Sequence, residues 1–196
     1  MNAKLDFRAN FARLAVELVT EFHRAFGQPI RTEPTIVPQN EFDLRARLLK
    51  EELDEYIDAY EADDIVGMAD ALGDMVVIVT GTTLVFGLNL EHLVRSYKTV
   101  NNWALTDAVY SATESLTTLE EFGRTLAAVM VLTCEEADRR GIPLRPVLYE
   151  IHASNMTKFG DDGTVLLRED GKVLKGPNFR LPNLAPILAQ AGFPVE

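Results

Sequence analysis

The sequence is organised around the acidic stretch Glu51-Glu52-Leu53-Asp54-Glu55, which is followed by a second one, Asp70-Ala71-Leu72-Gly73-Asp74. Both lie in segments whose apolar residues recur with helical spacing, and no proline occurs between Pro38 and Pro143. On a helix with 3.6 residues per turn, the first and last acids of each stretch are four residues apart and share a face. Two such helices packed antiparallel would direct four or five carboxylates to one place.

A cluster of this kind needs positive charge beside it. Repulsion between the carboxylates and the loss of their hydration would otherwise make it costly, whereas hard divalent cations such as Mg²⁺ or Mn²⁺ prefer oxygen ligands. A solvated helix face is the simpler explanation for one such pattern alone. The second pair argues against it, because Asp70 and Asp74 adjoin the strongly apolar run Met75-Val76-Val77-Ile78-Val79. We therefore expect a metal site.

The composition narrows the class of protein. A chain of 196 residues that is 47% hydrophobic can bury one sizeable core. Its net charge of -11 argues against stable binding to nucleic acid, which would require a basic surface. The single cysteine, Cys134, excludes an internal disulfide and fits a reducing compartment. The longest apolar run, about 75–86, is too short to span a bilayer, so we expect a cytoplasmic protein without membrane contact.

The apolar spacing predicts helices over about 7–26, 39–62 and 65–86, and a fourth that begins near Leu90. A weak internal repeat with an offset of 54 residues pairs Gly87-Leu88-Asn89-Leu90 with Gly141-Ile142-Pro143-Leu144. Gene duplication would explain this repeat, and so would the general similarity of any two helix–glycine–helix units. In the second copy, Arg124 and Ala128 replace the acidic pair, so that copy would hold no metal.

The character of the chain changes after Lys158. The stretch 160–175 predicts a short β-hairpin with its turn at Asp170-Gly171, and 184–191 predicts a short closing helix. We therefore predict an all-α fold: a helical domain over 1–160, in which 88–141 is an inserted or duplicated helical pair, and a C-terminal hairpin and tail over 161–196.

The acids could serve phosphate chemistry, which requires positioning and charge neutralisation at the transferring phosphorus. Two cations in such a site would hold phosphate oxygens and activate a water for in-line attack. The candidate phosphate-binding groups are Asn155, Lys158, Lys172 and Lys175. A di-iron carboxylate bundle would need Glu-x-x-His pairs, which none of the three histidines supplies. Cys134 has no convincing catalytic partner and is expected to be a buried thiol.

The acidic motif resembles the all-α nucleoside triphosphate (NTP) pyrophosphohydrolase superfamily, which includes MazG-like proteins, phosphoribosyl-ATP pyrophosphohydrolase and the dimeric dUTPases. Three further stretches are similar to MazG-like and phosphoribosyl-ATP pyrophosphohydrolase-like proteins of phages and bacteria: Glu21-Phe22-His23-Arg24-Ala25-Phe26-Gly27, Ser154-Asn155-Met156-Thr157-Lys158, and the segment 168–179 from Arg168 to Phe179. The stretch 88–141 lies outside the similarity. Many members carry glutamate where this chain has Ala71, and here the acid stands one position earlier, at Asp70.

The resemblance implies a MazG-like helical bundle, built into dimers or dimers of dimers, that cleaves between the α and β phosphates. It implies Mg²⁺, with Mn²⁺ as the alternative, held by four acids with help from Asp70: Glu51, Glu52, Glu55 and Asp74. It also places Asn155 and Lys158 near the phosphates. If the repeat is a true duplication, the metal-free copy could replace a partner subunit and the protein would be a monomer.

The resulting hypothesis is a Mg²⁺-dependent pyrophosphohydrolase that acts on an NTP or dNTP. In it, Glu52 orients or deprotonates the attacking water, and Lys158 with Lys175 neutralises the departing pyrophosphate. His23 is a candidate substrate-binding residue, although it could equally pack in the core. The alternatives are a phosphoribosyl-ATP pyrophosphohydrolase and a non-catalytic helical nucleotide-binding module. The preferred base is not predicted.

Overall fold

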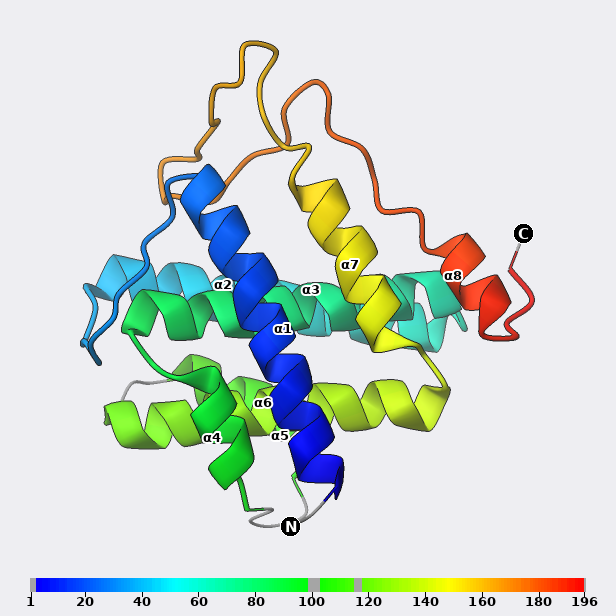
Figure 1. The fold of residues 1–196 in the computed structure, drawn as a ribbon, viewed down its shortest axis with the longest axis horizontal. Coiled ribbons are helices and arrows are strands. Elements are labelled where there is room, and N and C mark those ends of the chain that lie inside the picture. The colour runs from blue at the N-terminus through cyan, green and yellow to red at the C-terminus, as the bar shows by residue number, and fades with distance from the viewer. Residues whose placement is uncertain (1–2, 99–102, 115–117, 196) are drawn as a thin grey trace.

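The computed structural model describes residues 3–98, 103–114 and 118–195, and these ranges form a bundle of eight α-helices (Figure 1). The helices are α1 (Ala3–Ala25), α2 (Gln39–Glu61), α3 (Ile65–Phe86), α4 (Leu90–Ser96), α5 (Leu105–Glu114), α6 (Leu119–Arg140), α7 (Leu144–Asn155) and α8 (Ala185–Gln190). The predicted all-α class is confirmed. The stretch 88–141 holds three helices, α4, α5 and α6, where we predicted a pair.

Helix α3 is the centre of the bundle. It packs against α1, α2, α6 and α7, and most of its side chains are buried. The Asp64 side chain accepts hydrogen bonds from the backbone N–H groups of Val66 and Gly67, both at 3.0 Å, and Gly87 ends the helix. By length and composition the whole helix could cross a membrane, but 61% of its most apolar window is buried inside the protein. A core helix has the same composition.

Helices α2 and α3 form an antiparallel hairpin joined by the short turn 62–64. Near the turn, a Cβ built on Gly67 would lie 3.0 Å from the Ala59 Cβ; far from it, a Cβ on Gly81 would lie 3.3 Å from Arg45 Nη1. Midway between these two levels, Glu52 of α2 lies opposite Asp74 of α3. The hairpin register therefore brings one acid of each predicted stretch to the same level.

The two halves of the predicted repeat have matching helices. Helix α6 has 22 residues, like α3, and both begin and end at positions that differ by 54. The glycine after each helix has a positive φ, +67° at Gly87 and +76° at Gly141, and the next helix begins three residues later in both copies. The predicted helix–glycine–helix units are thus present, while their origin by duplication stays a prediction.

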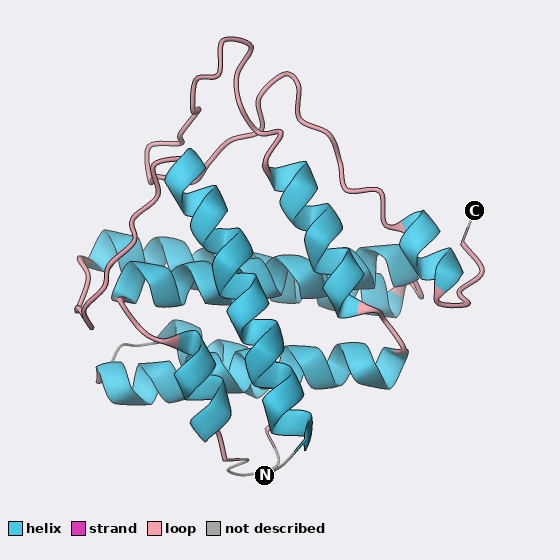
Figure 2. Cartoon of the chain, in the orientation of Figure 1, coloured by secondary structure: helices cyan, strands magenta, loops and turns pink. Residues whose placement is uncertain are grey.

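The predicted C-terminal β-hairpin is wrong. Figure 2 shows no strand in the part of the chain that the structure describes, and the segment has only one isolated antiparallel bridge, between Leu167 and Val173. The turn itself is present, because the Gly171 N–H donates to the Arg168 carbonyl at 2.8 Å. Two short strands without a third partner are marginal in water. Instead, the segment extends as a loop over the ends of α1 and α7 (Figure 1).

A polar network between α2 and α6 holds the bundle together away from the acidic residues. Tyr56 donates a hydrogen bond to the buried Glu136, and Arg140 Nε donates to the same carboxylate at 2.8 Å. Burial acts to raise the pKa of Glu136, but these two hydrogen bonds hold it below its usual value.

Replacing Glu136 with Gln is expected to lower the free energy of unfolding by about 1.5–3 kcal/mol, because the charge-assisted hydrogen bonds are lost. Urea unfolding measures this change. Enzymatic activity should stay within about twofold of the native value, since Glu136 lies outside the acidic cluster. A variant as stable as the native protein would show that the network contributes little.

Candidate functional site

The acids of α2 and α3 meet at the hairpin face that is covered by α7 and the C-terminal segment. Glu52 and Asp74 line the same pocket. One oxygen of Glu52, Oε2, and one of Asp70, Oδ1, are buried without a hydrogen-bond partner among the described residues. A buried carboxylate oxygen is unfavourable unless a hydrogen-bond donor or a positive charge lies beside it.

Burial and mutual repulsion raise the pKa values of these acids. Burial, then the charges of Asp74, Glu55 and Asp70, raise the pKa of Glu52 to about 9. Burial, then Asp74 and Glu55, raise the pKa of Asp70 to about 7, and burial raises the pKa of Asp74 as well. A divalent cation would relieve both causes, because it supplies positive charge to several oxygens at once. The donor set therefore fits Mg²⁺ or Mn²⁺ chemically.

The predicted metal ligands differ in how free their carboxylates are to bind a cation. Glu51 accepts from Lys172 Nζ at 2.6 Å and lies 3.7 Å from Arg47 Nε, while Glu55 is exposed. Within the described ranges, no three His, Cys, Asp or Glu side chains are close enough to hold a metal ion as they stand. Metal binding at these acids would therefore require side-chain rotation, and Lys172 would compete for Glu51.

Positive charge reaches the acids from the end of α7 and from the C-terminal segment. Lys158 follows α7 by one turn, and burial lowers its pKa although the neighbouring Asp74 acts to raise it. Asn155, the last residue of α7, lines the pocket together with Asp74 and acts to lower the pKa of that acid. The Lys175 ammonium lies 4.8 Å from the Phe179 ring centroid and acts electrostatically on Asp70 and Asp74. The predicted grouping of Asn155 and two lysines with the acids is thus present.

Local contacts hold these groups in place. The Gly176 N–H donates to the Lys158 carbonyl at 3.2 Å, and the Arg180 N–H donates to Thr157 Oγ1 at 2.9 Å. The Phe159 ring stacks on Phe26, which directly follows α1, with 4.2 Å between centroids. The C-terminal segment is therefore fixed against the ends of both helices.

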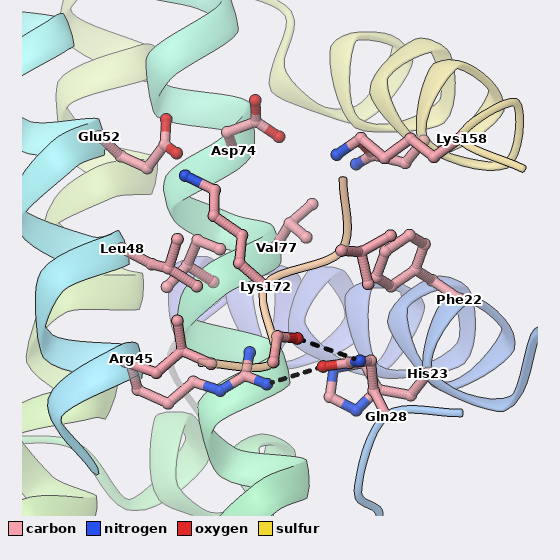
Figure 3. Close-up of a pocket in the computed structure, with 15 residues that line it drawn as sticks. Phe22, His23, Gln28, Arg45, Leu48, Glu52, Asp74, Val77, Lys158 and Lys172 are labelled. Carbon is pink, nitrogen blue, oxygen red and sulfur yellow. Dashed lines mark hydrogen bonds between the residues drawn. The ribbon is translucent and has the colours of Figure 1, made fainter. Parts of the chain in front are cut away.

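A pocket extends from the acids along the hairpin (Figure 3) and contains about 650 Å³ of empty space, open to solvent in part. Glu52, Asp74, Lys158 and Lys172 line one end. Its middle is apolar, and its other end is lined by polar side chains from three segments: His23, Gln28 and Arg45. This mixture of apolar and polar groups is typical of small-molecule sites.

The structure places His23 in the pocket but away from the acids. Its Nδ1 hydrogen-bonds the Pro29 carbonyl at 2.9 Å, and burial lowers its pKa to about 4, so the ring is neutral. Since a carbonyl only accepts, Nδ1 carries the proton and Nε2 is an acceptor. Arg45 was not among the residues predicted from the sequence. Its seven-residue spacing from Glu52, two turns on the same helix face, was the available signal.

The raised pKa values predict that the metal-free protein loses stability as the pH rises. In the unfolded chain Glu52 ionises near its ordinary pKa of 4.5, and in the fold near 9, so the folded state binds the extra proton between these values. Neutral His23 has the opposite effect, but only below about pH 6.5. We expect the free energy of unfolding in EDTA to fall between pH 6.5 and 9, with Glu52 contributing up to about 1.4 kcal/mol per pH unit and the lowered pKa of Lys158 acting in the opposite direction.

Urea titrations across this range would measure the slope, with Mg²⁺ added in a parallel series. Mg²⁺ should stabilise most at the high end, where the carboxylates are ionised. A metal-free stability that is constant or rises over this range would contradict the assigned cluster.

Two comparisons with known proteins bear on this site. The model of the phosphoribosyl-ATP pyrophosphohydrolase family matches residues 19–101, which include the α2–α3 hairpin and all five acids. An uncharacterized protein of Acanthamoeba polyphaga mimivirus is 25% identical over an alignment of 249 residues, which covers 93% of this chain and 99% of the viral one. No solved structure matches the chain. The family match supports a pyrophosphohydrolase type of function.

Proposed function

We propose that the protein is a Mg²⁺-dependent pyrophosphohydrolase of nucleoside triphosphates, because residues 19–101 match the model of the phosphoribosyl-ATP pyrophosphohydrolase family, which is part of the MazG-like all-α NTP pyrophosphohydrolase superfamily. It would release the nucleoside monophosphate and pyrophosphate. The observation that carries this proposal is a set of half-buried acids with raised pKa values, of which Glu52 and Asp74 line one end of a pocket together with Lys158 and Lys172.

The acids would hold the cation: Glu52, Asp70 and Asp74, joined by Glu51 and Glu55 after rotation. When bound, Mg²⁺ neutralises charge on the phosphate oxygens. Asn155, which lines the pocket beside Asp74, would help to orient that acid.

The reaction forms a bond between a water oxygen and the α-phosphorus and breaks the bond between that phosphorus and the oxygen that bridges to the β-phosphate. Glu52 is the residue placed to accept the proton of the water, once positive charge beside it keeps its carboxylate ionised. Lys158, which lies across the pocket from Glu52 (Figure 3), and Lys175 would stabilise the departing pyrophosphate with their charges.

A pyrophosphate-release assay on a panel of NTPs, dNTPs and phosphoribosyl-ATP tests the proposal. We expect pyrophosphate and a monophosphate in the presence of Mg²⁺ or Mn²⁺ and none in EDTA. Inorganic phosphate as the first product would contradict cleavage between the α and β phosphates.

The panel also separates the alternatives. The matched family's description makes phosphoribosyl-ATP a second candidate substrate, and a strong preference for it would select that function. Nucleotide binding without any pyrophosphate release would indicate a non-catalytic module.

A further inference from the structure

We propose that the far end of the pocket recognises the nucleobase through Arg45 and selects a base with two adjacent hydrogen-bond acceptors, such as guanine, over adenine. The inference rests on the proposed function and deepens it, because it names the substrate class. It also disfavours ATP and phosphoribosyl-ATP, which are adenine nucleotides.

The two ends of the pocket are separated by about the length of a nucleotide. On α2, Arg45 precedes Glu52 by seven residues, and on α3, Gly81 follows Asp74 by seven. Seven residues are two helical turns, or about 10.5 Å along the axis. A nucleotide with its α-phosphate at the acids would extend its base over about this length. The stretch between is apolar, lined by Leu48, Val77 and Ile78, and suits the sugar and the face of a base.

The Arg45 guanidinium is buried with most of its donors unused. Its side chain has one hydrogen bond to the described protein, a long one of 3.4 Å from Nη2 to Gln28 Oε1. The nearby Glu41 does not pair with Arg45, because it forms a bidentate ion pair with Arg31 at 2.9 and 3.0 Å. A guanidinium carries five N–H donors and no acceptor, and Arg45 lines the pocket with most of these donors free.

Neighbouring side chains fix the orientation of Arg45. Gln28 accepts from Arg45 and also donates to the Gly171 carbonyl at 3.5 Å, which ties the arginine to the C-terminal segment (Figure 3). Gly81 leaves the space that two side chains use: a Cβ there would lie 2.8 Å from His23 Nε2 and 3.3 Å from Arg45 Nη1. Glycine inside a helix costs stability, and here it permits this close approach.

The chemistry of the bases then determines the choice. The site offers adjacent N–H donors from Arg45 and an acceptor at His23 Nε2. Guanine presents N7 and O6 as adjacent acceptors, followed by the N1–H donor, and arginine commonly binds that acceptor pair with two hydrogen bonds. Adenine has no edge with two adjacent acceptors, so its amino group would oppose one of the arginine donors. A site that leaves buried polar groups unpaired rejects the wrong ligand strongly.

The test compares kcat/KM for dGTP and dATP in the native protein and in Arg45→Met. The native protein should prefer dGTP by about tenfold to a hundredfold. Arg45→Met should raise KM for dGTP by a similar factor, leave dATP within about threefold, and bring the ratio close to one. Retained hydrolysis of dATP would show that this variant folds. Arg13→Met, which removes an exposed arginine of α1, is the matched control and should keep the native ratio.

Gly81→Ala keeps all charges and should also reduce the preference, because its methyl group would displace His23 and Arg45. Equal losses for both nucleotides in Arg45→Met, or a native preference for dATP, would overturn the inference. If no nucleotide is hydrolysed, the proposed function fails, and calorimetric titration with GMP and AMP still tests base reading: tighter GMP binding that Arg45→Met abolishes would support it, and equal binding would overturn it.

Discussion

Replacing Glu52 with Gln should abolish pyrophosphate release and, without divalent cations, stabilise the fold. Glu52 has an unpartnered buried oxygen, and burial together with Asp74, Glu55 and Asp70 raises its pKa to about 9. The amide has the same shape but carries no charge that must be desolvated or held beside other acids. We expect the free energy of unfolding in EDTA at pH 8 to rise by about 1–2 kcal/mol.

Activity should move in the opposite direction. An amide cannot accept the proton of the attacking water and is a poorer ligand for Mg²⁺, so kcat should fall by about 100-fold to 10,000-fold. Stabilisation by Mg²⁺ should also shrink. Glu120→Gln, at a carboxylate of α6 that is 82% exposed, is the control and should change neither quantity. Normal activity in Glu52→Gln would remove Glu52 from the mechanism.

Replacing Gly176 with Ala should lower activity at least tenfold with little change in global stability. A Cβ at this position would lie 2.1 Å from the Phe159 carbonyl oxygen and 2.9 Å from that of Lys158. Both are backbone atoms, so the chain itself must move. Gly176 follows Lys175 in the sequence and contacts the backbone of Lys158. A shift of about 1 Å in catalytic groups lowers the rate roughly 100-fold.

Gly163→Ala is the matched control for this change. Gly163 lies in the same segment and has a positive φ of +77°, but a Cβ added to it would have no heavy atom within 4 Å. The substitution therefore introduces backbone strain without displacing the lysines. Similar kcat values for the two variants would show that the contact between Gly176 and the residues after α7 does not position the site. Thermal unfolding of both proteins would confirm that the helical core is unchanged.

Much of the fold could be predicted from local patterns. Helix α3 begins and ends where the apolar spacing, Asp64 and Gly87 predict, because helix formation and capping depend on neighbours within a turn or two. The hairpin at 160–175 could not be decided in this way. Its turn depends on Asp170 and Gly171 and is present, whereas strands depend on partners that are remote in sequence, and here the segment packs on helix ends instead.

The candidate site was predictable in part, for the same reason. The sequence by itself determined that acids share the faces of two helices and that Asn155 and Lys158 stand together, since these relations follow from residue spacing within one helix or turn. Only the tertiary structure decided which acids are partly buried, that Lys172 reaches Glu51 from 121 positions away, and that Arg45 and His23 form the other end of the pocket. Those relations are set by how helices pack, where contacts between distant residues and exclusion of water determine charge, pKa and access.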